Sequence, residues 1–156
     1  MNSLEIFNRR IQQAVKASTI LVRDSAQEQH RYATKTGNLE KATDYRITDS
    51  GMQGVVFLDS NVAKYAPFVH EGTAAHLIRP KNKTILRFVP RGGNGFIFAR
   101  KVFHPGTKAD PFLYDAINRK RGDVYATFAK ATNMALEDIS GSDWLGKSDH
   151  EIKIRL

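Results

Sequence analysis

The side chains best suited to chemistry in this chain are its five histidines, because the sequence contains no cysteine. The absence of cysteine excludes a disulfide framework, a thiolate metal site and a thiol nucleophile. His70-Glu71 begins like the helical motif of zinc proteases, but that motif needs a second histidine where this chain has Ala74. One metal-based alternative stays open. It is a metal-dependent hydrolase built on His70, Glu71, His76 and His104, and it predicts tightly bound metal.

The glycine-rich stretches do not match a phosphate-binding loop. The stretch at residues 92–95 is not followed by Lys-Ser or Lys-Thr, and Gly106-Thr107-Lys108 has the wrong residue order. No serine lies in a nucleophile elbow, and no two carboxylates are spaced as an acid/base pair. We therefore expect a protein that is not an enzyme and that carries no catalytic residue, metal or cofactor.

The positive charge of the chain is concentrated in one window. The formal net charge is +8, and residues 79–108 hold eight basic side chains and no acidic one. A patch of one sign favours a polyanion or an acidic protein surface as partner, although a solvated basic loop has the same composition. The residues that we expect to face DNA or such a partner are Lys81, Lys83, Arg87, Arg91, Arg100 and Lys101.

Four phenylalanines are interleaved with these basic residues: Phe88, Phe96, Phe98 and Phe103. Exposed aromatic rings beside basic groups could stack on the bases of single-stranded nucleic acid. The alternation of Phe96 and Phe98 is instead typical of a strand with one buried face, and we expect these rings to form the core face of a hairpin. Phosphate contact by the basic residues alone, without sequence readout, stays an alternative.

Two long amphipathic helices are predicted at either end of the chain. The first begins at Asn2, which can cap it together with Glu5, and its pattern fades near Tyr32 before a stop at Gly37-Asn38. The second begins at Asp110-Pro111 and spans 111–139. Its length would be about 44 Å, so either it breaks near Gly122 or it extends beyond the body of the domain.

Short strands are predicted between the helices, at Tyr45–Thr48, Val55–Leu58, Thr84–Val89 and Phe96–Phe103. The last two would form a long hairpin. The order of elements predicts an α+β fold, an antiparallel sheet packed by a long N-terminal helix and a long C-terminal helix. We expect one domain over 1–140 and a tail or arm over 141–156, whose alternating end, Ile152–Leu156, could add to a sheet edge.

No segment is predicted to cross a membrane, since the longest wholly apolar runs hold about four residues and a spanning helix needs about 20. The N-terminus carries Glu5 where a secretory signal has basic residues. We expect no membrane partner and synthesis in the cytoplasm.

The middle of the chain holds several short fragments in a specific order and spacing, over roughly residues 35–118, just over half of the chain. These are Thr36-Gly37-Asn38-Leu39, Tyr65–Thr73, His76–Lys81, Leu86-Arg87-Phe88, Val102–Thr107 and Pro111–Ala116. Together they resemble the tail-completion or head–tail joining proteins of long-tailed bacteriophages.

The resemblance implies a structural virion component, a minor tail protein without catalytic residues. Such a protein completes the tail or joins it to the head, as a ring subunit at the neck near the DNA channel. Its partners would be copies of itself, other tail or head-connector proteins and non-specific DNA. It would assemble in the host cytoplasm and reside in the virion. A stand-alone nucleic-acid-binding module that uses residues 79–108 is the alternative.

Within the resembling fragments, small and turn-forming residues have a structural interpretation. A glycine followed by threonine, as at residues 72–73 and 106–107, favours a tight turn in which the hydroxyl bonds local backbone, and a proline ends a strand or begins a helix. The residues concerned are Gly72, Thr73, Pro105, Gly106, Thr107, Pro111 and Phe112. The last forty residues have no counterpart in the resemblance.

Overall fold

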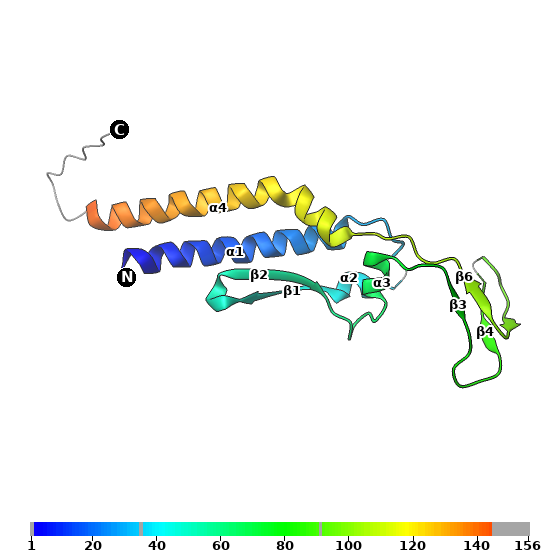
Figure 1. Cartoon of the computed structure of the whole chain (residues 1–156). Helices are drawn as coiled ribbons and strands as arrows, with labels where there is room; N and C mark the ends of the chain where they lie inside the picture. The colour runs from blue at the N-terminus through cyan, green and yellow to red at the C-terminus, as the bar shows by residue number, and fades with distance from the viewer. Residues whose placement is uncertain (1, 35, 91, 145–156) are drawn as a thin grey trace.

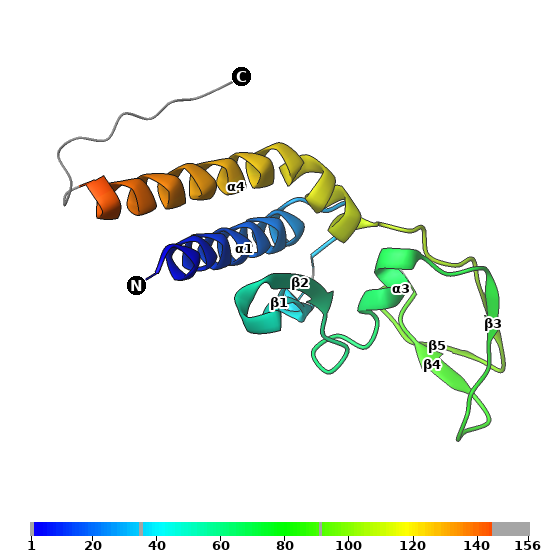
Figure 2. The ribbon, with the colours of Figure 1, turned by 60° about the vertical axis from the view of Figure 1, so that its left-hand side comes forward.

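The computed structural model describes residues 2–34, 36–90 and 92–144. Two long helices lie side by side and form an elongated body, with a β-hairpin against one of them and a strand-built extension at one end (Figures 1 and 2). The predicted α+β class, with a long helix at each end of the chain, is confirmed. Arg91 and most of the predicted tail lie outside the described residues.

Helix α1 (Ser3–Glu28) begins as the sequence predicts. The Asn2 side chain accepts a hydrogen bond from the Glu5 amide at 2.8 Å, and the Glu5 carboxylate accepts one from the Asn2 amide at 3.0 Å. This reciprocal pair satisfies two amides that have no partner within the helix. The helix ends at Glu28, before the predicted stop at Gly37-Asn38, and Asn38 instead begins the short helix α2 (Asn38–Ala42).

Helix α4 (Phe112–Trp144) runs without a break past Gly122 and is about 50 Å long. It does not project from a compact body, because α1 lies along much of its length and the body itself is elongated (Figure 1). An ion pair between Arg10 and Asp138, with a nitrogen–oxygen distance of 2.7 Å, joins the two helices far from the start of α4. Residues 141–144, which we assigned to the tail, belong to this helix.

Strands β1 (Thr43–Thr48) and β2 (Gln53–Leu58) form an antiparallel hairpin that packs on α1. The turn between them is the 3₁₀ helix η1 (Asp49–Gly51). Gly54 of β2 lies so close to α1 that an added Cβ would come within 1.7 Å of the Thr19 hydroxyl. The absence of a side chain at this position therefore sets how closely the sheet approaches the helix.

The core lies where α1, α2, α4 and helix α3 (Ala66–Glu71) meet. Its members are mostly small, which allows the helix backbones to approach closely, and Phe112 is its largest fully buried side chain. The buried residues of this cluster are Val22, Ala26, Leu39, Ala42, Ala63, Ala66, Phe112 and Ala116.

Four short strands build the extension: β3 (His76–Ile78), β4 (Leu86–Phe88), β5 (Ile97–Ala99) and β6 (Val102–His104). β3 pairs with β6 and β4 with β5, both antiparallel. The predicted hairpin is therefore shorter than expected, since its second arm is divided into β5 and β6. In the described part of the chain, the single predicted sheet is in fact three separate two-stranded pairs.

None of the helices in the described part of the chain has the length and apolar character needed to cross a membrane.

Candidate functional site

The candidate site is the extension formed by residues 73–109, which we call the arm (Figures 1 and 2). Its base is a pair of backbone hydrogen bonds between Thr73 and Thr107, at 2.9 and 3.1 Å, reinforced by the Thr73 hydroxyl, which accepts from the Thr107 amide. The two chain segments of the arm are therefore joined where they leave the body.

Two glycines allow this close crossing. Gly72 and Gly106 have φ angles of 77° and 93°, a region that side chains rarely adopt. A Cβ on Gly106 would come within 2.3 Å of the Thr73 carbonyl oxygen, and one on Gly72 within 2.8 Å of the Thr107 carbonyl oxygen. The residues that carry the phage resemblance thus meet in space at the base of the arm, although more than thirty positions separate them in sequence.

Aromatic side chains pack together where the arm joins the body. The buried His70 ring contacts the edge of the Phe112 ring, with 5.3 Å between centroids, and Phe112 also meets Tyr32 edge to face at 5.2 Å. The Asp110 amide donates to the Val69 carbonyl at 3.0 Å, which links α3 to the segment that returns from the arm. Pro111 and Phe112 therefore belong to the anchorage of the arm rather than to its surface.

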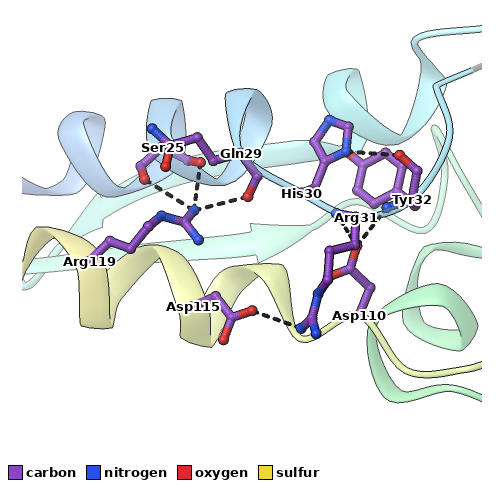
Figure 3. A network of polar contacts seen from close by, with 8 residues as sticks. All are labelled: Ser25, Gln29, His30, Arg31, Tyr32, Asp110, Asp115 and Arg119. Atoms are coloured by element: carbon purple, nitrogen blue, oxygen red, sulfur yellow. Dashed lines mark hydrogen bonds and ion pairs between the residues drawn. The ribbon is translucent and has the colours of Figure 1, made fainter.

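Asp110 is buried and joins the end of α1 to the start of α4 (Figure 3). Its carboxylate accepts the backbone amides of Arg31 and Tyr32 at 2.7 and 2.8 Å, and it also accepts from the Arg31 side chain at 3.2 Å. The same Arg31 guanidinium donates to Asp115 at 2.9 Å. An acidic residue directly before Pro111 is typical of a helix cap, but the Asp110 side chain bonds the segment that follows α1 instead.

Arg119 adds a second link between the two long helices (Figure 3). Its guanidinium donates to the carbonyl oxygens of Ser25 and Gln29, both at 3.0 Å. These carbonyls lie at the C-terminal end of α1, where a positive charge is favourable; the Ser25 carbonyl also accepts the Gln29 amide at 3.1 Å.

Tyr32 lies beside this network and stacks on His30, with 3.6 Å between ring centroids. Its hydroxyl is buried and has no hydrogen-bond partner in the described structure. Burial, together with the negative charges of Glu40 and Asp110, raises the pKa of Tyr32 well above its ordinary value.

The basic residues predicted to face a partner are all on the arm. Those that the structure describes are exposed, and no carboxylate in the described part of the chain pairs with any of them. They lie on β4 and on the segments that flank the strands, and they are Lys81, Lys83, Arg87, Arg100 and Lys101. The arm therefore presents uncompensated positive charge to its surroundings.

The prediction that Phe96 and Phe98 form a buried core face is wrong. Phe96 is 56% exposed, Phe98 64% and Phe103 68%. The Arg87 guanidinium lies over the Phe96 ring, 3.6 Å from its centroid, so charge and aromatic surface are combined at one place.

No described residue of the arm is buried. Each strand pair is only two strands wide, and such pairs are marginal in water without a face to pack on. The arm leaves several large apolar side chains exposed. They are Leu77, Ile78, Ile85, Val89, Phe96, Ile97, Phe98 and Phe103.

The residues of the metal-hydrolase alternative fall into two separate pairs. His70 Nδ1 lies 2.9 Å from the Glu71 carboxylate, whereas His76 and His104 face each other across β3 and β6 with 5.1 Å between ring centroids. The His104 Nδ1 accepts from the Gly106 amide at 3.1 Å, so it serves the turn at the base of the arm. Within residues 2–34, 36–90 and 92–144, no three histidine or carboxylate side chains converge to hold a metal.

The body of the molecule also carries a groove that the sequence does not predict. A largely apolar groove of about 690 Å³ lies between α1, β2, α3 and α4. Leu113, Ile117 and Val124 recur at helical spacing in the sequence, yet Ile117 is 51% exposed. Periodicity predicts which residues share a face and cannot show whether a neighbour covers it.

Comparisons of this chain with protein-family models, with curated proteins and with solved structures gave no match.

Proposed function

We propose that this chain is a structural subunit of a bacteriophage particle that completes the tail or joins it to the head. In this role it forms a ring at the neck, and its arm faces the DNA channel or an acidic partner protein. It does no catalysis. The proposal is supported by the resemblance of residues 35–118, whose turn residues meet at the base of the arm.

The observation that carries the proposal is the composition of the arm surface. The arm combines unpaired basic side chains with exposed aliphatic and aromatic ones, and it has no buried residue among those described. A surface of this kind suits an assembly contact, in which apolar groups are covered and charges meet phosphates or carboxylates. The long helix pair supplies a rigid body behind it.

The test is a charge reversal on the arm in the phage or prophage that encodes the chain. Lys81→Glu, Lys83→Glu and Arg87→Glu together replace three exposed cations by anions, so we expect a loss of infectious particles with the fold intact. Circular dichroism of the purified variant checks the fold. Particle titre and electron microscopy of heads and tails check the assembly.

A matched control makes the same change in net charge on the body. Lys16, Lys41 and Lys130 are exposed lysines outside the arm, and their replacement by Glu should leave the titre close to wild type. Wild-type infectivity of the arm variant, or an equal loss in the control, contradicts the role of the arm.

The exposure of the arm phenylalanines also favours a second candidate, a stand-alone nucleic-acid-binding module. Base stacking on Phe98 or Phe103 beside exposed cations would bind single strands without sequence preference. This candidate predicts binding to free oligonucleotides whose logarithmic affinity falls linearly with the logarithm of salt concentration. Absent or salt-insensitive binding to single strands and duplexes excludes it.

A further inference from the structure

The two strand pairs of the arm expose apolar side chains on both of their faces. Neighbouring residues of a strand point to opposite faces. In β5, Ile97 is 47% exposed and Phe98, on the other face, is 64% exposed. In β3, the adjacent residues Leu77 and Ile78 are both exposed as well. The arm therefore has apolar surface to cover on two sides, unlike a sheet that packs one face on a core and turns the other to water.

Positive charge lies on the same strand pairs. Arg87 is directly opposite Phe98 in the β4–β5 register, so the two side chains share a face. The Arg87 guanidinium also lies over the Phe96 ring, which places Phe96 on that face. Residues 72–109 contain no aspartate and no glutamate. A partner that fits this surface must cover apolar side chains and supply negative charge beside them.

A nucleic acid strand would account for only part of this surface. Its phosphates could contact the cations and its bases could stack on Phe98, but stacking uses one face of a strand pair. Ile97 lies on the face opposite Phe98, and Ile78 lies on the face opposite Phe103, the partner of Leu77 in the register. These aliphatic side chains offer no ring for a base and would stay in water. A protein cleft covers both faces at once.

Charge disfavours a second copy of the chain as the partner. Two arms repel each other, because each carries basic side chains and no acidic one. The apolar groove on the body is lined by two charged side chains, Glu71 and Arg121, so it has no surplus of negative charge to offer an arm. A different protein, with an acidic surface of its own, has neither disadvantage.

We infer that the arm inserts into an apolar cleft with an acidic rim on another protein of the proposed particle. The walls of the cleft cover both faces of the strand pairs, and its carboxylates pair with Arg87 and with the exposed cations that flank the strands, among them Lys83 and Lys101. This inference rests on the proposed function and deepens it, because it assigns the arm to a protein rather than to the DNA of the channel.

Photo-cross-linking from both faces of the arm identifies the partner. Benzoylphenylalanine replaces Ile97 in one variant and Phe98 in another, and each variant is produced together with the proteins encoded beside its gene. We expect both variants to form an adduct with the same one of those proteins, identified by mass spectrometry. Benzoylphenylalanine in place of Leu136, which is exposed on α4 of the body, is the matched control and should form no adduct with that protein.

Paired substitutions then measure the contribution of each face. Ile78→Ser with Ile97→Ser changes the faces opposite Phe103 and Phe98, and Phe98→Ser changes the face that carries Arg87. We expect the affinity for the captured protein to fall about tenfold or more in both variants, the loss typical of truncating an anchoring interface side chain. Leu136→Ser should leave the affinity unchanged. All of these side chains are exposed, and circular dichroism checks that the fold is retained.

Hydrogen exchange adds a measurement that needs no variant. No described residue of the arm is buried, and a two-stranded pair without a packed face is marginal in water. The amides of β4 and β5 should therefore exchange rapidly in the free chain and slowly in the complex with the captured protein. Exchange rates that the complex leaves unchanged contradict the insertion of the arm.

Four other outcomes overturn the inference. Cross-linking of Phe98 to nucleic acid, with no protein adduct from Ile97, assigns the arm to nucleic acid. Adducts between two copies of the chain assign it to a second copy. Isoleucine changes without effect on affinity leave the second face uncovered, and no adduct from either position removes the protein partner.

Failure of the inference is distinguishable from failure of the proposed function. If Lys81→Glu, Lys83→Glu and Arg87→Glu together abolish infectious particles while the isoleucine changes are neutral, the arm acts in assembly and only the cleft is excluded. Wild-type infectivity of the charge-reversed variant removes the arm from assembly, and the cleft with it.

Discussion

At the scale of single residues, the glycines at the base of the arm have a defined mechanical task. Gly106 adopts a positive φ and lies against the Thr73 backbone, so both its conformation and its missing side chain are needed for the crossing. Gly95, near the tip of the arm, has neither requirement, because it has no positive φ and open space around the position of a Cβ. These two positions form a natural pair for comparison.

Gly106→Ala should open the base of the arm. The added Cβ cannot fit at 2.3 Å from the Thr73 carbonyl, so we expect a loss of at least about 2 kcal/mol in local stability. Hydrogen exchange at the Thr73 and Thr107 amides measures it, and both should exchange faster. Gly95→Ala should leave both rates unchanged. Equal protection in wild type and Gly106→Ala contradicts this account of the base.

The raised pKa of Tyr32 predicts that the folded chain loses stability at alkaline pH. Its pKa is raised in the folded chain, so below about pH 10, the ordinary value, both folded and unfolded states are protonated. Above that pH the unfolded state ionises first, and stability is lost as the pH rises toward the folded-state pKa. Tyr32→Phe lacks this loss.

Urea unfolding at pH 8 and at pH 10.5 checks the prediction. At pH 8 the variant should be as stable as wild type, since the hydroxyl that it lacks is buried without a partner. At pH 10.5 it should be the more stable protein. A variant that loses stability in parallel with wild type would show that Tyr32 is not the titrating group.

At the scale of elements, the two long helices and the first hairpin were predictable, since each has a strong local signal. The capping pair of Asn2 and Glu5 begins α1 where the sequence predicts, and the predicted strands at 45–48 and 55–58 are β1 and β2. Helix α3 and strand β3 were not predicted, because six and three residues are too few for a periodic pattern.

The arm shows where sequence reasoning fails for a physical reason. The alternation of Phe96 and Phe98 is the same whether a face packs on a core of its own chain or is left for a partner. The described basic residues of the window lie together on the arm, because they are close in sequence. The role of Asp110 depends on Arg31 and Tyr32, almost eighty positions away, and no local pattern encodes it.

Asp110→Asn tests the joint between the long helices. The carboxylate accepts two backbone amides and the Arg31 side chain, and an amide group cannot accept all three, so we expect a loss of about 3 kcal/mol in unfolding free energy. Asp115→Asn removes one exposed ion pair of the same arginine and should cost less than about 1 kcal/mol. Urea unfolding measures both, and equal losses would contradict a special role for Asp110.

At the scale of the whole molecule, the described chain is a long helical body with an exposed arm at one end and an apolar groove on the body. The arm carries unpaired positive charge and exposed aromatic rings. The surface of the arm is accounted for if the chain is the ring subunit that we propose and if the arm reaches DNA or another virion protein.

Native mass spectrometry of the full chain tests this account most directly. It should be recorded over a series of concentrations, alone and with the proteins encoded beside its gene. The account predicts one oligomer of discrete mass, or discrete assembly on a partner ring. A chain that stays monomeric at every concentration and binds none of those proteins would contradict it.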